Sequence, residues 1–331
     1  MGLKGNKSMK VIEVNNLSKD FKIGLKVKGF KNKIKNFFKP KYNVKHAVDD
    51  ISFAIDEGEA VAFIGPNGAG KSTTIKMLTG ILYPTSGSIS VLGLDPSVDR
   101  VKLSYLVGTV FGQKEQLWVH LSPMDNFKFF GAIYDIDKDI LNERIEKYVN
   151  LFDISKFVNQ PVKSLSLGQR MKCEMVASLL NEPKILFFDE PTIGLDPVAK
   201  DTLRKLIKKI NKELGTTILF TSHDVGDIET VCKRVIIIND GKIVLDDTMR
   251  NLKYHYLNKK LIQVKMSKKV DLPKIDGMEV IKSKDGAYEI EADMDKVTVD
   301  KILSLFSGDD IEDITISSTP LEDIIKNIYQ R

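Results

Sequence analysis

The sequence predicts an α/β fold, in which helices cover both faces of a parallel sheet, followed by a small α+β domain. Short runs of β-forming residues alternate with helical segments along much of the chain, and this alternation is typical of a parallel core sheet. One all-apolar run leads directly into a glycine-rich turn. After about residue 250 the pattern changes to short strands with few helices. The length of 331 residues is sufficient for about two domains.

The composition is that of a folded globular protein and excludes several classes. Apolar residues make up 42% and charged residues 29% of the chain, which excludes disordered, collagen-like and disulfide-scaffold proteins. The apolar stretches, such as 235–238, fall far short of the ~18 residues that span a bilayer, and the start has no apolar core of a signal peptide. Cys173 and Cys232 match no metal-binding spacing and are expected to be buried thiols in a reducing compartment.

Two strands separated by a basic insert are predicted for the N-terminal part. Residues 10–21 and 47–55 alternate between apolar and polar side chains, which predicts strands. The insert, residues 22–45, contains nine lysines and no acidic residue. The whole chain has a net charge of only +5, so the remainder of the protein is mildly acidic.

The insert is predicted to form an amphipathic helix that ends at Pro40. Its large apolar residues recur at steps of three and four, with lysines on the other face; they are Val27, Phe30, Ile34, Phe37 and Phe38. Such a helix could lie on an anionic membrane surface or cover the base of a partner protein. Alternatively, it is a solvated hairpin whose apolar face packs on its own domain. Nucleic acid fits less well, because no aromatic and basic residues interleave elsewhere in the chain.

The other elements of the first domain follow from apolar spacing. Residues 60–64 are all apolar and predict a buried parallel strand. Helical spacing occurs at 141–152 and 169–180, and short β-rich runs occur at 185–188, 217–220 and 235–238. We assign residues 1–248 to one domain, with a helical subdomain at about 112–180.

The second domain, residues 249–331, is predicted to be a small α+β domain. Its expected strands are 261–266, 278–281, 288–291 and 311–316, and its expected helices are 299–306 and 321–329. No clustered histidine, cysteine or glycine-rich loop indicates chemistry in this domain. The second domain could stabilise or regulate a dimer, or it could have only a packing role.

A phosphate-binding loop follows the buried strand at 60–64. Residues 65–72, which are Gly65, Pro66, Asn67, Gly68, Ala69, Gly70, Lys71 and Ser72, match G-x-x-x-x-G-K-[ST] just before a helical pattern that begins at Thr73. Backbone N–H groups and the positive end of the helix can bind phosphate, and the lysine can reach the β- and γ-phosphates. The Ser72 hydroxyl can ligate Mg²⁺. The segment from Gly65 to Thr73 is therefore expected to bind ATP, with Mg²⁺ as cofactor.

Two acidic residues end the apolar strand at 185–188. Asp189 and Glu190 lie at the carboxyl end of this strand, where open α/β sheets place their ligands. Asp189 is expected to hold Mg²⁺, and Glu190 to orient or deprotonate the attacking water.

With these motifs in this order, residues 10–245 resemble the ATPase subunits of ATP-binding cassette transporters. The fold implied is a P-loop cassette with a parallel core sheet, an antiparallel β subdomain and a helical subdomain. Residues 165–169 (LSLGQ) resemble the family signature LSGGQ, in which Ser166, Leu167, Gly168 and Gln169 would contact ATP held by the opposite subunit. Leu167 replaces the first glycine of that signature. Residues 311–316 and 319–325 more weakly resemble the tails of ATPases that serve exporters of drugs, polysaccharides or ions.

Three further positions take their roles from the resemblance alone. Gln113 is similar to the Q-loop glutamine that meets Mg²⁺ or the lytic water, although Gly112 is an extra residue before it, and Gln116 is the alternative. Asp196 is similar to the D-loop aspartate at the dimer interface. His223 is similar to the switch histidine that hydrogen-bonds the γ-phosphate.

An aromatic residue that stacks on adenine is also implied by the family. Counting back from the strand at 49–53 favours Tyr42, whereas the pattern at 17–21 favours Phe21. We expect Tyr42, and Phe21 stays open.

The resemblance implies a cycle in which two copies close over two Mg²⁺-ATP. Lys71, Gln113, Glu190 and His223 are the expected catalytic residues, with Glu190 as the base. A separate multi-span permease would carry out transport, in the direction of export. The alternative is a soluble cassette ATPase that acts on nucleic acid or ribosomes. The expected location is the cytoplasmic face of the cell membrane, as a peripheral subunit. Trp118 and residues 121–130 follow the Q-loop, where this family docks its partner, although a buried role is equally open.

Overall fold

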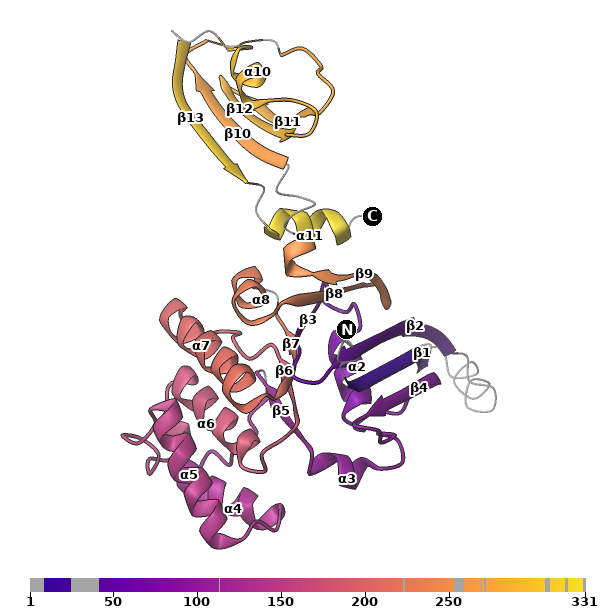
Figure 1. Cartoon of the computed structure of the whole chain (residues 1–331), viewed down its shortest axis with the longest axis vertical. Coiled ribbons are helices and arrows are strands. Elements are labelled where there is room, and N and C mark those ends of the chain that lie inside the picture. The colour runs from indigo at the N-terminus through magenta and orange to yellow at the C-terminus, as the bar shows by residue number, and fades with distance from the viewer. Residues whose placement is uncertain are drawn as a thin grey trace, which may run out of the picture. The chain divides into compact units, whose positions relative to one another are not determined.

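The computed structural model describes residues 9–24, 42–112, 114–222, 224–252, 259–268, 270, 272–306, 310–318 and 321–329. The chain divides into two compact units, Met1–Asp246 and Asp247–Arg331 (Figure 1). Each unit has its own hydrophobic core.

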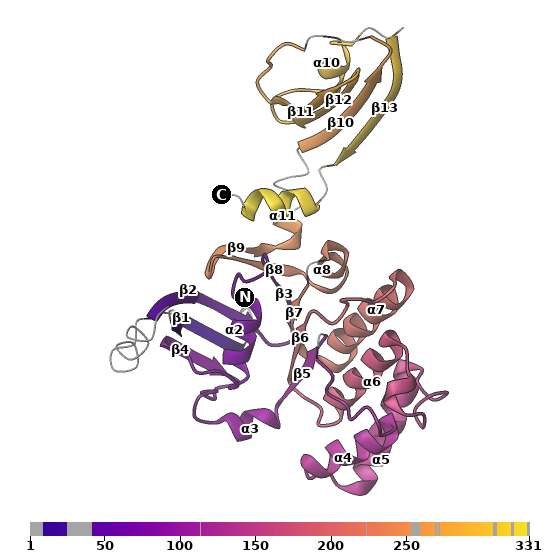
Figure 2. The same cartoon turned by 180° about the vertical axis from the view of Figure 1, so that it is seen from behind.

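A six-stranded sheet forms the centre of the first unit (Figure 2). Its order is β5 (Val107–Phe111), β6 (Ile185–Asp189), β7 (Thr217–Thr221), β3 (Ala60–Ile64), β8 (Arg234–Asn239) and β9 (Lys242–Thr248). The first five strands pair in parallel. Strand β9 follows β8 after two residues, a connection that only antiparallel strands can make. Every residue of β3 and β7 is buried, which explains why β3 (AVAFI) and the centre of β7 (ILF) are continuously apolar rather than alternating.

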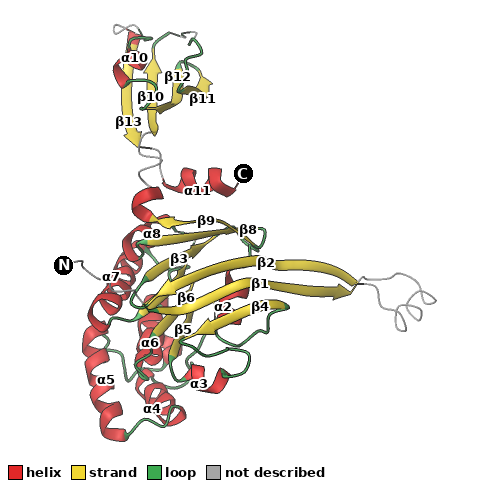
Figure 3. Ribbon diagram, turned by 45° about the vertical axis from the view of Figure 1, so that its right-hand side comes forward, coloured by secondary structure: helices red, strands yellow, loops and turns green. Residues whose placement is uncertain are grey.

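A smaller antiparallel sheet packs on the same core. Its order is β2 (Tyr42–Asp56), β1 (Lys10–Gly24) and β4 (Ser86–Val91). The rings of Phe53 on β2 and Phe63 on β3 lie 5.7 Å apart between their centroids, so aromatic packing joins the two sheets. Figure 3 shows that β1 and β2 extend as a two-stranded ribbon beyond β4.

The two ends of the basic insert form strands, and the helix predicted between them stays a prediction. Lys22–Gly24 belong to β1 and Tyr42–Lys45 to β2, and the two strands remain paired up to Gly24 and Tyr42. Cross-strand backbone pairing, which the helical spacing did not reveal, sets the conformation there. Residues 25–41, which carry the predicted apolar face, lie outside the described residues.

Helices cover the central sheet and form the helical subdomain. They are α2 (Lys71–Leu78), α3 (Arg100–Ser104), α4 (Pro123–Ile133), α5 (Lys138–Phe152), α6 (Leu167–Leu179), α7 (Pro197–Leu214) and α8 (Val225–Val231), with a 3-10 turn at Val162–Ser164. Local capping sets several starts: Ser122, Asp137 and Asp196 each accept a hydrogen bond from the first turn of the following helix. Helices α4, α5 and α6 gather in one group (Figure 1), within the limits predicted for the helical subdomain.

Several elements of the first unit were not predicted. They are helices α3 and α4 and strands β4, β5 and β9. Strand β4 (SGSISV) contains three serines and a glycine, and it forms because β1 provides a pairing partner from Ile12 to Ser18.

The second unit is an α+β fold with an antiparallel sheet. The strand order is β11 (Met278–Lys284), β12 (Ala287–Asp293), β10 (Lys259–Met266) and β13 (Ile311–Ser318). Alternate strand residues, such as Ile262, Val264 and Ile290, face a core to which the helical residue Ile302 also contributes. Helix α10 (Val299–Leu303) is shorter than predicted, and α11 (Leu321–Tyr329) begins and ends as predicted. The predicted α/β fold class with a small α+β addition is confirmed.

Candidate nucleotide site

The phosphate-binding loop connects β3 to α2 and has a backbone that favours glycine. Gly70 has φ +111°, and a Cβ atom on it would lie 2.5 Å from the carbonyl oxygen of Ala47. A side chain is therefore excluded at the position directly before the helix. No side chain in the described ranges caps the N-terminus of α2, so its N–H groups and positive end are available to an anion. Asn67 and Gly68 lie exposed at the crown of the loop.

Lys71 lies inside this loop. It is 5% exposed, and its Nζ donates hydrogen bonds to the carbonyl oxygens of Gly65 at 2.7 Å and Pro66 at 3.1 Å. Burial lowers the pKa of Lys71, while the charges of Glu190 and Asp189 act to raise it. The hydrogen bonds of Lys71 therefore stabilise the loop conformation. Its positive charge also interacts favourably with the two acids expected at the catalytic centre.

Ser72 and Asp189 are brought together from positions 117 residues apart. The Ser72 Oγ donates to Asp189 Oδ1 at 3.1 Å, and the Thr221 Oγ1 donates to the same oxygen at 2.8 Å. The hydroxyl and carboxylate oxygens are the ligand types that Mg²⁺ prefers, and such sites use only one or two protein carboxylates alongside phosphate oxygens. The donor set therefore fits Mg²⁺. Among the described residues, no group of three or more His, Cys, Asp or Glu could hold a metal alone.

Glu190 follows Asp189 in a constrained turn. Its φ is +55°, an uncommon value for a residue with a side chain, and its N–H group lies 3.0 Å from Thr221 Oγ1. A cavity of 220 Å³ next to it is lined by Ser72, Lys76, Ile81, Phe111, Lys114, Asp189 and Glu190. The turn therefore places Glu190 beside Ser72 and Asp189, at the edge of a space that a reacting group could enter.

The structure explains the extra glycine before Gln113. The N–H of Gly112 donates to the Asp189 carbonyl at 2.9 Å, and a Cβ atom on Gly112 would lie 2.0 Å from the carbonyl oxygen of Glu190. Any larger residue would displace Glu190. Gln113 itself lies outside the described residues.

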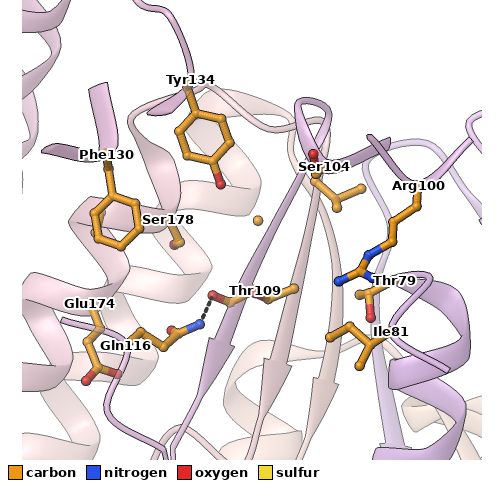
Figure 4. Close-up of a pocket in the computed structure, with 13 residues that line it drawn as sticks. Thr79, Ile81, Arg100, Ser104, Thr109, Gln116, Phe130, Tyr134, Glu174 and Ser178 are labelled. Atoms are coloured by element: carbon orange, nitrogen blue, oxygen red, sulfur yellow. Dashed lines mark hydrogen bonds between the residues drawn. The ribbon is translucent and has the colours of Figure 1, made fainter. Parts of the chain in front are cut away.

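The alternative glutamine, Gln116, lies in a different pocket. Its amide donates to the Thr109 carbonyl at 3.1 Å, and it lines a second cavity together with Glu174, Phe130 and Tyr134 (Figure 4). The cavity that contains Gln116 and the cavity beside Ser72 and Asp189 share only one described lining residue, Ile81. This placement favours Gln113 for the nucleotide role.

Ser166 is the N-cap of α6. Its Oγ accepts from the Gln169 N–H at 3.3 Å, and the Gln169 side chain accepts from the Ser166 N–H at 2.9 Å, which is a capping box. Ser166 is exposed, so the start of the helix faces solvent. The unusual Leu167 packs near the D-loop, since a Cβ atom on Gly194 would lie 3.2 Å from its Cδ2 atom.

Asp196 begins α7 next to this segment. Its Oδ1 accepts from the N–H groups of Val198 at 3.0 Å and Ala199 at 2.9 Å. Ala199 in turn contacts the signature, because a Cβ atom on Gly168 would lie 3.1 Å from the Ala199 side chain. The signature and the D-loop are therefore neighbours in the folded chain.

A buried carboxylate, which sequence reasoning missed, joins the segments around Glu190 and His223. Asp227 is fully buried and accepts from Ser222 Oγ at 2.5 Å and from Arg204 Nε at 2.5 Å. It also accepts from the Thr192 hydroxyl. His223 lies outside the described residues, but Ser222 directly precedes it. The only sequence signal was an acid four residues after the histidine.

The two candidate adenine-stacking residues lie on the exposed ribbon of β1 and β2. Phe21 pairs with Lys45, and Tyr42 pairs with Gly24 at the far end. Ala47, which contacts Gly70, is two residues from Lys45 and five from Tyr42. At about 3.3 Å per residue, Tyr42 lies roughly 16 Å along the strand from Ala47. Lys45, and therefore its cross-strand partner Phe21, lies only about 7 Å along the strand from Ala47. Tyr42 stays a prediction, and the strand register favours Phe21.

Comparisons with known proteins place this geometry in a family. The family described as "ABC transporter" matches residues 48–193. The ABC transporter ATP-binding protein NatA of Bacillus subtilis is 32% identical over 233 residues, which cover 70% of this chain and 94% of NatA. The linearmycin resistance ATP-binding protein LnrL of the same organism is 31% identical over 214 residues, covering 65% of this chain and 68% of LnrL.

Solved structures show the same fold. The CbiO1 protein of Clostridium perfringens, described as part of the ABC transporter complex CbiONQ, aligns with a TM-score of 0.62 and 28% identity, covering 74% of this chain and 91% of that chain. The cassette MJ0796, in a dimeric post-hydrolysis state with ADP and phosphate, aligns with a TM-score of 0.61 at 24% identity. The chain belongs to the ABC transporter ATP-binding family and is an ATP-hydrolysing cassette.

Proposed function

We propose that this ABC ATPase powers a separate transmembrane permease, in the direction of export, by closing as an ATP-dependent homodimer. The observation that carries the proposal is the convergence of Ser72, Asp189 and Glu190 on one cavity, while the Ser166 helix start remains exposed. One half of a shared site is thus assembled within the chain, and a solvent-facing anion-binding helix end is available for a second copy.

The chain's own residues have distinct tasks in this proposal. The loop from Gly65 to Thr73 binds the phosphates, and Lys71 exchanges its bonds to Gly65 and Pro66 for bonds to the β- and γ-phosphates. Ser72, Asp189 and Gln113 would hold Mg²⁺, which when bound neutralises phosphate charge. Glu190 accepts a proton from the attacking water, and His223 donates a hydrogen bond to the γ-phosphate.

The second copy completes the site. Ser166, with Leu167, Gly168 and Gln169, supplies a helix N-terminus to the ATP held by the other subunit, and Asp196 lies beside it at the interface. Ser166 already accepts a bond from Gln169 N–H, so its hydroxyl proton is free to be donated to a phosphate oxygen. Binding of ATP to the closed form then shifts the open and closed populations, and hydrolysis reverses the shift.

Transport requires a partner in the membrane. No helix within the described ranges is long and apolar enough to cross a bilayer. One relative supports export, since LnrL is described as a linearmycin resistance ATP-binding protein. We propose that the subunit lies at the cytoplasmic face of the membrane, that its partner docks near Trp118, and that the basic residues 22–45 contact anionic lipid. The predicted second domain, residues 249–331, would stabilise or regulate the dimer.

The decisive variant is Glu190→Gln. It keeps the size of the side chain but cannot accept the proton, so ATP should still bind and drive dimerisation while turnover falls by ~10²-fold or more. Light scattering with ATP and a phosphate-release assay measure the two effects. Undiminished turnover would remove Glu190 from the role of base.

A second experiment tests the transport class. The tagged full-length chain is purified from solubilised membranes, and the proteins that accompany it are identified. A multi-span protein supports the proposal, whereas ribosomes or nucleic acid in its place would support the alternative of a soluble cassette ATPase.

A further inference from the structure

A pocket at the junction of the sheet and the helical subdomain contains a buried carboxylate. The cavity has a volume of 210 Å³ and is lined by residues of α3, β5, α4 and α6. In Figure 4, Glu174 lies beside Gln116 at one end, Phe130 and Tyr134 lie above it, and Arg100 lies on the opposite wall. The proposed nucleotide chemistry does not use this cavity.

The buried carboxylate of Glu174 has no cation of its own, because its nearest cation also pairs with another glutamate. It is 2% exposed, and among the described residues neither carboxylate oxygen accepts a hydrogen bond of ordinary geometry. The backbone N–H of Gln116 lies near enough to favour the charged form, but it does not complete the set of partners. The nearest cation is Arg170, whose Nε lies 3.7 Å from Glu174 Oε1. However, the Nη1 of Arg170 is hydrogen-bonded to Glu115 Oε1 at 2.5 Å. Two carboxylates therefore share one guanidinium.

Such an arrangement is costly for the isolated subunit. A buried carboxylate without a full set of partners destabilises a fold, and native structures leave very few buried polar groups unsatisfied. Burial raises the pKa of Glu174 to about 7, although Arg170 and the backbone of Gln116 oppose the shift. An additional cation at this carboxylate would remove the cost.

The surroundings of the pocket resemble a protein interface. Large apolar side chains stand exposed around it, which are Ile81, Tyr105, Trp118, Phe129 and Ile133. The rings of Trp118 and Phe129 meet edge to face, with centroids 4.0 Å apart, and Trp118 also stacks on Phe130 of the pocket wall. Exposed aromatic residues around a pocket are typical anchors for a partner.

We propose that this pocket receives an arginine or lysine side chain from a cytoplasmic segment of the permease, and that this cation pairs with Glu174. The inference rests on the proposed function, since it assumes a permease, and adds the chemistry by which the permease is recognised. Apolar residues that flank the cation would pack on Trp118 and Phe129. Arginine suits the site better than lysine, because its planar guanidinium can bond both carboxylate oxygens.

Photo-crosslinking tests the contact directly. Benzoylphenylalanine is introduced in place of Phe130 in the full-length chain, membranes are irradiated, and the crosslinked peptides are sequenced. We expect a cytoplasmic segment of a multi-span protein with an arginine or lysine close to the crosslink. If no membrane protein is captured, the proposed function itself is wrong. If a permease is captured through a segment without any basic residue, only the inference about Glu174 is wrong.

A matched pair of variants then measures the role of the charge. With the purified permease, Glu174→Gln should weaken binding by about tenfold or more, whereas Glu146→Gln, which changes an exposed glutamate of α5, should not. Neither change should alter the ATPase activity of the isolated subunit. Combining Glu174→Gln with loss of the permease's basic residue should add little to either change alone. Binding of the Glu174→Gln variant at wild-type affinity, or additive losses, would overturn the proposal.

Discussion

Glu174 also makes a prediction about the stability of the isolated subunit. Its pKa is raised from 4.5 to about 7 in the folded protein, chiefly by burial; Arg170 and Gln116 oppose the rise and Glu115 adds to it. Arg100 and Tyr134 line the same pocket. Below about pH 4.5 the carboxyl is protonated in both the folded and the unfolded chain, so it has no effect. As the pH rises, the unfolded chain loses this proton first, and the free energy of unfolding falls until about pH 7.

The corresponding loss is about 3 kcal/mol between pH 4.5 and 7. Glu174→Gln should remove this part of the pH dependence, so the decline from pH 5 to pH 8 should be smaller than in the wild type. Urea unfolding, followed by the fluorescence of Trp118, the single tryptophan of the chain, measures it. Glu146→Gln should keep the wild-type decline, and an equal decline in all three proteins would show that Glu174 does not titrate in this range.

Gly112 must be a glycine because the backbone of Glu190, which is distant in the sequence, packs against it. The position looked like a departure from the family pattern, and the structure shows that its missing side chain leaves room for the carbonyl of Glu190. The Q-loop is therefore bound to the turn that carries the expected base through Gly112 and Asp189.

Among the elements, α6 links local stability with the proposed dimer. Ser166→Ala removes the side-chain cap and should lower the free energy of unfolding by about 1 kcal/mol. It should also raise the ATP concentration needed for dimerisation, because the hydroxyl offered to the opposite subunit is lost. Thermal unfolding and light scattering with ATP measure the two effects.

Asp137→Ala is the matched control for this prediction. Asp137 caps α5 through the N–H groups of Asp139 and Ile140, so its loss should cost a similar amount of stability without changing ATP-dependent dimerisation. If both variants dimerise equally well, Ser166 does not contact ATP in the opposite subunit.

Asp227 connects three elements and should affect both stability and catalysis. In Asp227→Asn, one of the oxygens that accept from Ser222, Thr192 and Arg204 becomes an amide, and Arg204 loses its nearest charged partner. We expect a loss of about 3 kcal/mol in stability. Because Thr192 is two residues after Glu190 and Ser222 precedes His223, kcat should fall while KM for ATP changes little.

The exposed acid Asp201 supplies the comparison for Asp227. It pairs with Lys205 on the surface of α7, and such pairs contribute less than about 1 kcal/mol. Asp201→Asn should therefore leave stability and kcat near wild type. If the fall in kcat for Asp227→Asn is fully accounted for by the fraction of the variant that is unfolded, Asp227 contributes to stability alone.

At the scale of the whole molecule, the two cores should unfold separately. The first unit buries a core around Phe63 and Ile236, and the second around Val264 and Ile290, with the division after Asp246. Calorimetry should show two transitions. ATP at 100 times its Kd should stabilise only the first unit, by about 2.7 kcal/mol. A single transition that ATP shifts as a whole would show that the two units fold cooperatively.

The fold class and much of the candidate site could be predicted because their signals are local. The loop from Gly65 to Ser72 combines a turn that needs glycine with the start of a helix, and the apolar run before it needs burial on both faces. Those requirements hold over a few consecutive residues. By contrast, the strands at the two ends of the basic insert, Lys22–Gly24 and Tyr42–Lys45, were not predicted, because each forms by pairing with the other across the insert.

By itself, the sequence determined the order of the elements, the phosphate loop and the acids that follow β6, since each depends on neighbouring residues and on backbone geometry. Only the tertiary structure decided which distant groups meet. It placed Asp189 beside Ser72, enclosed Asp227 among three donors, and left Glu174 buried without a full set of partners. The physical reason is that burial and hydrogen bonding depend on contacts between residues that are far apart in the chain, and no local pattern records them.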